Sequence, residues 1–191
     1  MKNFAKNNFP RENKEKGREK VRILSAITPD GFIYFDDTIS MLCKDLFIIE
    51  DVFGCVSHVL LSELRDAALR SGLDITTCYC PMAPKTKIES ILIPSIGVAF
   101  AVSNYWHPLE ENTTHRKIHT RRFIDNNIII TRKQRLNFNR KMQTVLMKEA
   151  IYYLSKAKGV HDELEALYRQ GMNYDKVDKT AGEIIDAIKK A

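Results

Sequence analysis

The amino-acid sequence predicts an α/β fold, in which a parallel sheet is flanked by helices and followed by a C-terminal helical hairpin. Three observations lead to this prediction. Short, almost wholly apolar runs at 45–50 and 96–103 are typical of strands buried on both faces of a parallel sheet. The stretch 57–70, which lies between them, carries apolar residues at the 3.6-residue period of an amphipathic helix. From residue 133 onward the apolar spacing is helical throughout.

The chain divides into three predicted parts. Residues 1–20 are polar and without periodicity, so we expect a disordered basic lead-in. The α/β core is expected to span 21–132. It would begin with a strand at 21–28 and continue, after a turn built on Pro, Asp and Gly, into a helix at 35–43.

Further strands are expected in the second half of the core. The segment 74–80 is rich in residues that favour strands, and 91–94 is a short apolar run. The segment 116–131 mixes basic and β-forming residues, and we expect a short strand followed by a loop. Trp106 and His107 follow the apolar run 96–103, where they would either line a pocket or close the edge of the core.

Residues 133–191 are predicted to form two helices, joined near 171–173 and packed on the core as an antiparallel hairpin. A dimerising coiled coil is the alternative, because the apolar residues of the first helix follow a heptad-like spacing. The seam of the first helix consists of Leu146, Ala150, Tyr153, Ala157, Val160, Leu164 and Leu167, and that of the second consists of Val177, Ala181, Ile184 and Ile188.

Charge is unevenly distributed along the chain, which has a net charge of +6. The segment 115–141 holds nine Lys or Arg residues and one Asp, whereas 21–114 is acidic. This contrast predicts either an intramolecular charge match or an anionic partner. One such partner is nucleic acid, gripped through its phosphates by 1–20 and 115–141.

The sequence also indicates the cellular compartment in which the protein is expected. No apolar run approaches the roughly 20 residues that span a bilayer, and no apolar segment follows the N-terminal positive charges as in a secretory signal. The four cysteines are therefore expected to be reduced thiols of a cytoplasmic protein without membrane contact. Cys78 and Cys80 form a C-x-C pair without the spacing of a zinc site, so we expect no metal.

The segment 48–58 has the layout of a phosphate-binding loop, with a strand, a short turn and a helix. A working loop reads GxxxxGK[ST], in which backbone N–H groups hold phosphate, Lys reaches the β- and γ-phosphates, and the hydroxyl binds Mg²⁺. Aligned on the strand and helix, the two glycines fall on Asp51 and Val56, the Lys on Ser57 and the hydroxyl on His58. The chemistry of the motif is therefore missing.

The candidate site is a degenerate nucleotide-binding loop in which Gly54 is the only glycine that remains. Glu50 and Asp51 would place carboxylates where phosphates lie, and two like charges 4 Å apart repel by about 4 kcal/mol at an effective dielectric of 20. No catalytic residue is expected. The candidate nucleotide-binding residues are Asp51, Gly54, Ser57 and His58.

With these residues in view, the chain resembles a bacterial family of P-loop ATPases, often labelled nucleotide kinases, that is built from two tandem P-loop halves. It is more similar to the second half, because Val102-Ser103-Asn104 stands where a metal-binding Asp would follow the strand. The resemblance covers roughly 20–191. It rests on the order and spacing of short motifs at 24–31, 45–70, 79–81, 91–94, 97–99, 156–158, 161–162 and 172–177.

The resemblance implies a P-loop NTPase fold and a missing partner, either a second copy of the chain or a complete P-loop protein. We expect a cytoplasmic pseudoenzyme without ATP hydrolysis, with a structural or regulatory role and no cofactor. The first alternative is a weak ATPase or nucleotide kinase-like enzyme, completed by a partner and dependent on ATP and magnesium. The second alternative is a nucleic-acid-binding protein that uses the basic segments.

Overall fold

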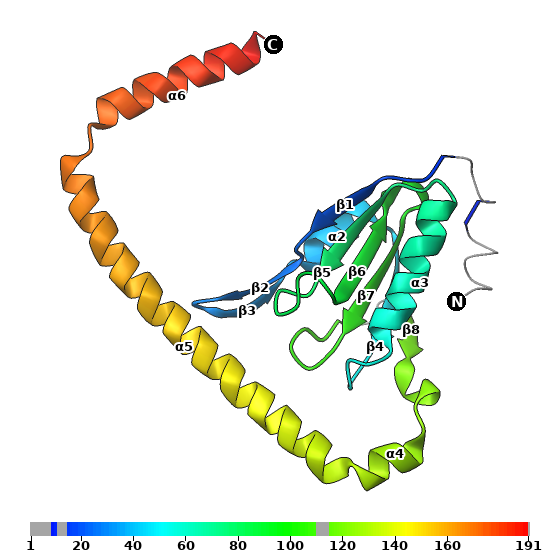
Figure 1. Cartoon of the computed structure of the whole chain (residues 1–191). Coiled ribbons are helices and arrows are strands. Elements are labelled where there is room, and N and C mark those ends of the chain that lie inside the picture. Colours follow the sequence, from blue (N-terminus) through cyan, green and yellow to red (C-terminus); the bar gives the residue numbers. More distant parts are fainter. Residues whose placement is uncertain (1–8, 11–14, 110–114, 191) are drawn as a thin grey trace.

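A six-stranded, mostly parallel sheet forms the body of the molecule (Figure 1). The computed structural model describes residues 9–10, 15–109 and 115–190. The strand order is β1-β5-β6-β7-β4-β8, and β6 alone runs antiparallel to both of its neighbours. The strands are β1 (Glu19–Arg22), β4 (Asp45–Glu50), β5 (Ile75–Tyr79), β6 (Ile88–Ile93), β7 (Val98–Ser103) and β8 (His115–His119).

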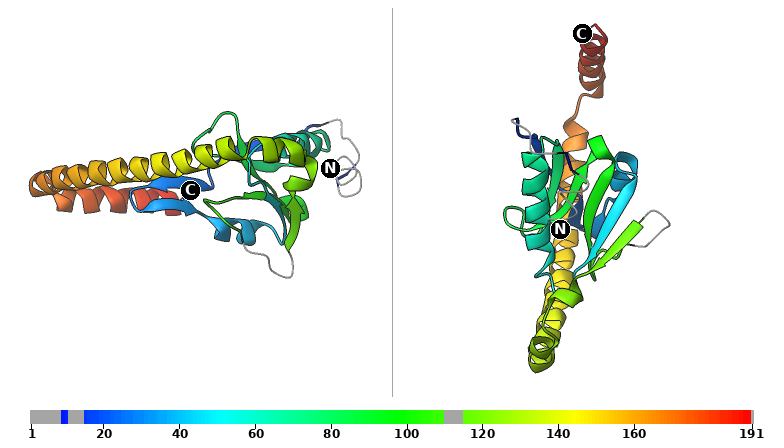
Figure 2. Two further views of the ribbon diagram at one scale, coloured as in Figure 1. Left: turned by 90° about the horizontal axis from the view of Figure 1, so that it is seen from below. Right: turned by 90° about the vertical axis from the view of Figure 1, so that its right-hand side faces the viewer.

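Helices cover both faces of this sheet, as the continuous apolar strands predict. Phe47 and Ile49 of β4 pack in the cluster beneath α3 (Ser57–Arg70). Leu46 and Ile48 belong to the opposite cluster, beneath α2 (Asp36–Leu42). Because side chains alternate along a strand, β4 buries both of its faces and has no polar side. The two helices lie on opposite sides of the sheet in Figure 2.

The first predicted strand, 21–28, is in fact divided between two sheets. β1 joins the edge of the large sheet beside β5, whereas β2 (Ser25–Thr28) pairs with β3 (Gly31–Tyr34) in a separate antiparallel hairpin. Gly31 has a positive φ of 129°, which the tight turn requires. The hydroxyl of Thr28 donates a 2.8 Å hydrogen bond to the carbonyl of Gly31.

The prediction of a disordered lead-in at 1–20 is wrong for several described residues. Phe9 is buried in the core beneath α3, and β1 begins at Glu19. Gly17 lies so close to the backbone of Leu73 that a Cβ would approach its carbonyl oxygen to 1.9 Å. Arg18 binds the carboxylate of Asp74 at 2.8 Å. Residues 1–8 and 11–14 lie outside the described part, and the prediction for them stays untested.

The segment after β8 also differs from its prediction, since the expected loop is largely helical. A short 3-10 helix, η2 (Thr120–Phe123), leads into α4 (Asn126–Thr131). The side chain of Asp125 caps α4 by accepting the N–H of Asn127 at 2.8 Å.

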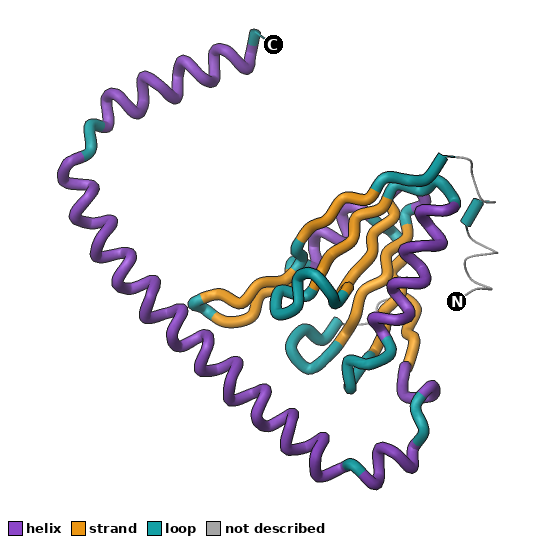
Figure 3. Tube along the Cα trace, in the orientation of Figure 1, coloured by secondary structure: helices purple, strands orange, loops and turns teal. Residues whose placement is uncertain are grey.

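Two C-terminal helices are present as predicted, but their antiparallel packing is not formed (Figure 3). At about 1.5 Å per residue, the 39 residues of α5 (Lys133–Gly171) span roughly 58 Å. This helix passes the β2–β3 hairpin, and among its described residues only Met147 is buried. Every described residue of α6 (Tyr174–Lys189) is exposed. None of the helices in the described ranges is both long and apolar enough to cross a bilayer.

The connection between these helices accounts for the missing hairpin. Met172 has an extended backbone, and Asn173 caps α6 by accepting the N–H of Lys176 at 3.1 Å. The chain therefore changes direction between the two helices, and α6 points away from α5 (Figure 1). The seam of α5 stays uncovered: Leu146 and Val160 are each 67% exposed.

Candidate functional site

The turn between β4 and α3 is built around the carboxylate of Asp51, which is 1% exposed. One carboxylate oxygen accepts the N–H of Gly54 at 3.0 Å. The other accepts the N–H groups of Val56 at 2.9 Å and Ser57 at 2.7 Å. The side chain of Asp51 therefore binds the backbone donors at the beginning of α3.

These donors are the groups that a phosphate-binding loop offers to its ligand. The first N–H groups of a helix have no partner within the helix, and together with the helix dipole they attract anions. Here the anion is supplied by the chain itself. Gly54 adopts a left-handed φ of 67°, which brings the backbone round to the carboxylate.

The electrostatics of Asp51 favour the charged form of its side chain. Burial raises the pKa of this carboxyl, but the N–H groups of Ser57, Val56 and Gly54 outweigh burial and hold it below its ordinary value. The hydroxyl of Thr120, just after β8, lies 3.4 Å from the same carboxylate and donates to the backbone carbonyl of Glu50 at 2.8 Å.

Glu50 does not share this position with Asp51. Its carboxylate points to the β8 side, where it contacts the ring of His119 and lies 3.9 Å from the amine of Lys117. The two acidic residues therefore lie on different sides of the backbone, and the expected repulsion between them is avoided.

The remaining residues of the predicted site contribute less. Ser57 is fully buried, and its hydroxyl helps to hold the pKa of the Asp51 carboxyl below its ordinary value. His58 is half-buried, and its Nδ1 has no partner in the described part. The structure thus brings Asp51, Gly54 and Ser57 together through the backbone, and no cation stands at the position of the motif's Lys.

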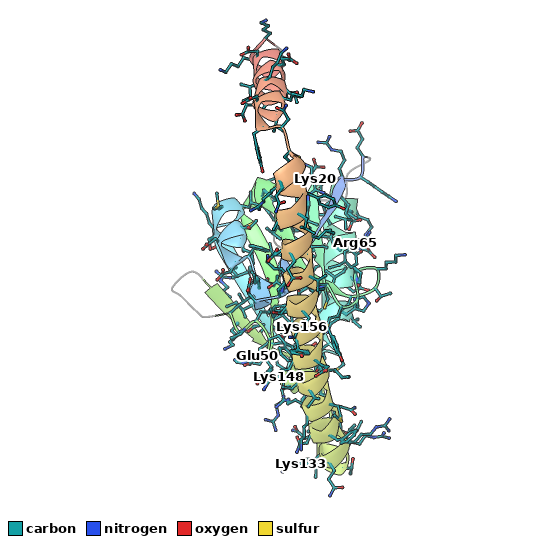
Figure 4. The ribbon with its side chains drawn as sticks, turned by 90° about the vertical axis from the view of Figure 1, so that its left-hand side faces the viewer. Lys20, Glu50, Arg65, Lys133, Lys148 and Lys156 are labelled. Carbon is teal, nitrogen blue, oxygen red and sulfur yellow. The ribbon has the colours of Figure 1, made fainter. Side chains whose placement is uncertain are left out.

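A cavity of about 650 Å³ lies next to this turn, between the strand ends and the first half of α5. Asp51 and Gly54 line one side of it, and Asn104 and Trp106, just after β7, line another. Because β4 and β7 are parallel neighbours, their carboxyl ends meet at this edge, where open α/β sheets commonly bind ligands. Figure 4 shows α5 passing across this side of the molecule, with Lys133 at its beginning.

A buried polar network borders the cavity, and sequence reasoning missed most of it. Glu89 is 4% exposed; it accepts the hydroxyl of Ser25 at 2.5 Å and lies 2.8 Å from Nε2 of His107. The same nitrogen of His107 is 2.8 Å from the amide nitrogen of Asn104. The ring of Tyr34 stacks on His107 with the ring centroids 4.7 Å apart.

One feature of the sequence pointed to the network: Glu89 is the only charged residue of β6, whose other residues are apolar except for Ser90. A lone acid in such a strand predicts a buried partner, although it does not say which one. Of the two alternatives for Trp106 and His107, the lining of a pocket describes both residues, and His107 is in addition buried.

Cys78 and Cys80 are buried free thiols. Burial raises the pKa of the Cys78 thiol to about 11, and it also raises the pKa of Cys80. Within the described ranges, no group of three His, Cys, Asp or Glu side chains is arranged to hold a metal ion.

Within the described part of the chain, the Lys and Arg residues of the basic segment 115–141 form few intramolecular ion pairs. Lys117 lies near Glu50, while Arg116 and Arg122 lie over the rings of Phe47 and Phe123. For the other Lys and Arg residues of this segment, the described part of the chain places no carboxylate within 4 Å.

Comparison of the chain with models of known families, with characterised proteins and with solved structures finds no match.

Proposed function

We propose that the chain is a degenerate P-loop-like module that does not hydrolyse ATP and has a structural or regulatory role. The observation that carries the proposal is the position of Asp51. Its carboxylate accepts three backbone N–H groups at the beginning of α3, where a nucleotide phosphate would bind. A phosphate would have to displace this carboxylate and then lie beside it, with a repulsion of about 4 kcal/mol at 4 Å and an effective dielectric of 20.

The expected position of the metal ligand supports the same proposal. Ser103 ends β7, where a nucleotide enzyme of this layout would place an Asp, and its hydroxyl accepts the N–H of Leu109 at 3.0 Å. The amide oxygen of Asn104 accepts the N–H of Trp106 at 2.8 Å. Both side chains are thus engaged within the chain, and neither is the anionic oxygen ligand that Mg²⁺ favours.

The structural or regulatory role is inferred from the exposed helices. The apolar seams of α5 and α6 are uncovered in the single chain, and contiguous apolar surface of this kind usually marks an interaction site. A second copy or a complete P-loop protein is the partner that the sequence resemblance implies.

Thermal unfolding with and without MgATP tests the proposal. A ligand at 100 times its Kd would stabilise the fold by about 2.7 kcal/mol, which for a chain of this size corresponds to a rise in Tm of roughly 5–11 °C. We expect no magnesium-dependent rise at millimolar MgATP and no release of phosphate from ATP. A clear magnesium-dependent rise would contradict the proposal.

A further inference from the structure

We propose that the cavity beside the Asp51 turn binds a small organic phosphate, no larger than a mononucleotide, through side chains that the phosphate-binding loop does not use. The proposal goes beyond the function proposed above, because it concerns the opposite walls of the cavity and requires neither the loop donors nor magnesium.

Unpaired positive charge is the first argument. Four cations line the cavity: Lys87 just before β6, Arg121 in η2, and Lys133 and Arg140 on α5. No carboxylate of the described residues lies within 4 Å of any of them. The lining carboxylates, Asp51 and Glu89, are already bound within the chain. The four cations outnumber these two carboxylates, so the lining carries an excess of positive charge.

The arrangement of these cations favours a phosphate over a single carboxylate. They come from three separate segments, the loop before β6, η2 and α5, and therefore do not form a single row along one helix. Guanidinium groups such as those of Arg121 and Arg140 bind phosphate oxygens in a bidentate manner, and a Lys amine adds a point charge. The amine of Lys87 reaches the turn, since a Cβ on Gly54 would lie 3.1 Å from it.

The other walls suit an organic body attached to the phosphate. Phe32, Phe53 and Trp106 supply apolar surface, while Glu89 and His107 supply buried polar atoms. Nδ1 of His107 is buried without a hydrogen-bond partner in the described part, although a buried imidazole nitrogen normally has one. A volume of about 650 Å³ lies within the usual range for small-molecule pockets.

The concave position of the cations distinguishes this ligand from nucleic acid. The lining positions on α5 are 133, 136, 137, 139, 140, 143 and 144. All of them except 139 share one face of the helix, whereas Arg135 and Lys141 do not line the cavity. A polymer held by the basic segment as a whole would depend on both sets of cations. A small ligand inside the cavity would depend on the lining set alone.

Calorimetric titration with ribose 5-phosphate and with inorganic phosphate tests the proposal. It is made without magnesium and with chloride adjusted to constant ionic strength. The cavity variant Lys133→Ala/Arg140→Ala is compared with the control Arg135→Ala/Lys141→Ala, which removes the same charge from the same helix. All four side chains are exposed, so both variants are expected to fold, and circular dichroism checks this. Arg121→Gln provides a second cavity variant.

We expect ribose 5-phosphate to bind more tightly than inorganic phosphate, because the cavity also contacts the sugar. The cavity variant should bind at least tenfold more weakly, since each charge-assisted hydrogen bond that is lost corresponds to about that factor. The control should bind like the wild type. The proposal would be overturned if neither ribose 5-phosphate nor inorganic phosphate bound, or if the cavity variant and the control variant lost the same affinity. Tight binding of a single-stranded RNA decamer in place of the small phosphates would assign the basic face to nucleic acid and likewise overturn it.

Discussion

Removal of the His107 side chain should destabilise the fold strongly, because Glu89 would lose its main partner in a buried site. Glu89 is 4% exposed, and in the described part of the chain its carboxylate is hydrogen-bonded to the hydroxyl of Ser25 and to the ring of His107. A buried hydrogen-bonding group that is left without its partner costs about 1–3 kcal/mol, and a charged group costs more. Loss of the ring stacking between His107 and Tyr34 adds about 0.5–1.5 kcal/mol.

The expected loss for His107→Ala is therefore about 4 kcal/mol of the free energy of unfolding, from the 5–15 kcal/mol that is typical of native proteins. Urea unfolding followed by circular dichroism measures it, with the denaturant slope as a check for two-state behaviour. Glu89→Gln is the informative companion, because it keeps the shape and removes the charge. It should cost less than His107→Ala, since no buried carboxylate is left without its partner.

The double variant Glu89→Leu/His107→Leu separates the pair from its packing. Buried ion pairs can be replaced by apolar side chains with little loss, so this variant should be more stable than His107→Ala despite its two changes. A loss below about 1 kcal/mol for His107→Ala, at an unchanged denaturant slope, would refute the reasoning. It would mean that Glu89 finds water or another partner in the folded state.

Three further predictions concern the turn at Asp51 and the exposed helices. Asp51→Asn should destabilise the fold by about 1–2 kcal/mol, like the loss of a helix cap. Because the folded pKa of Asp51 lies below its unfolded value, this stability difference should be constant from pH 5 to 7 and shrink as pH falls below about 4; a difference that grew in acid would contradict the assignment. The combined change of Asp51→Gly, Val56→Gly, Ser57→Lys and His58→Ser should create measurable phosphate binding at the turn. If this variant folds but does not bind nucleotide, the proposal that the turn is a degenerate P-loop is weakened. Self-association through the α5 seam should persist at 1 M salt, where the screening length falls to about 3 Å; sedimentation as a monomer at both low and high salt would exclude it.

The local elements were predictable because each depends on its own residues. The apolar run 45–50 and the amphipathic stretch 57–70 coincide with β4 and α3, since burial on two faces or one face leaves a direct mark on composition. The strand–turn–helix layout was predicted for the same reason. So was the absence of the motif's Lys and second Gly, which can be read directly from the chain.

The heptad-like spacing of α5 and α6 shows which residues form an apolar face, but not which surface covers that face. The predicted hairpin was one solution, and the structure instead leaves both faces exposed. Two residues decide this, Met172 with its extended backbone and Asn173 as the cap of α6. Their effect on the direction of the chain is geometric and has no counterpart in periodicity.

The sequence by itself determined that the phosphate-binding chemistry is missing, because that conclusion needs only the identity of the residues at 51, 56, 57 and 58. Only the tertiary structure showed that the carboxylate of Asp51 accepts the backbone N–H groups before and at the beginning of α3, since a side chain's hydrogen-bond partners depend on the path of the backbone. The network of Glu89 was hidden for a related reason. Its partners lie 64 residues away at Ser25 and 18 residues away at His107, and they meet only when the sheet is assembled.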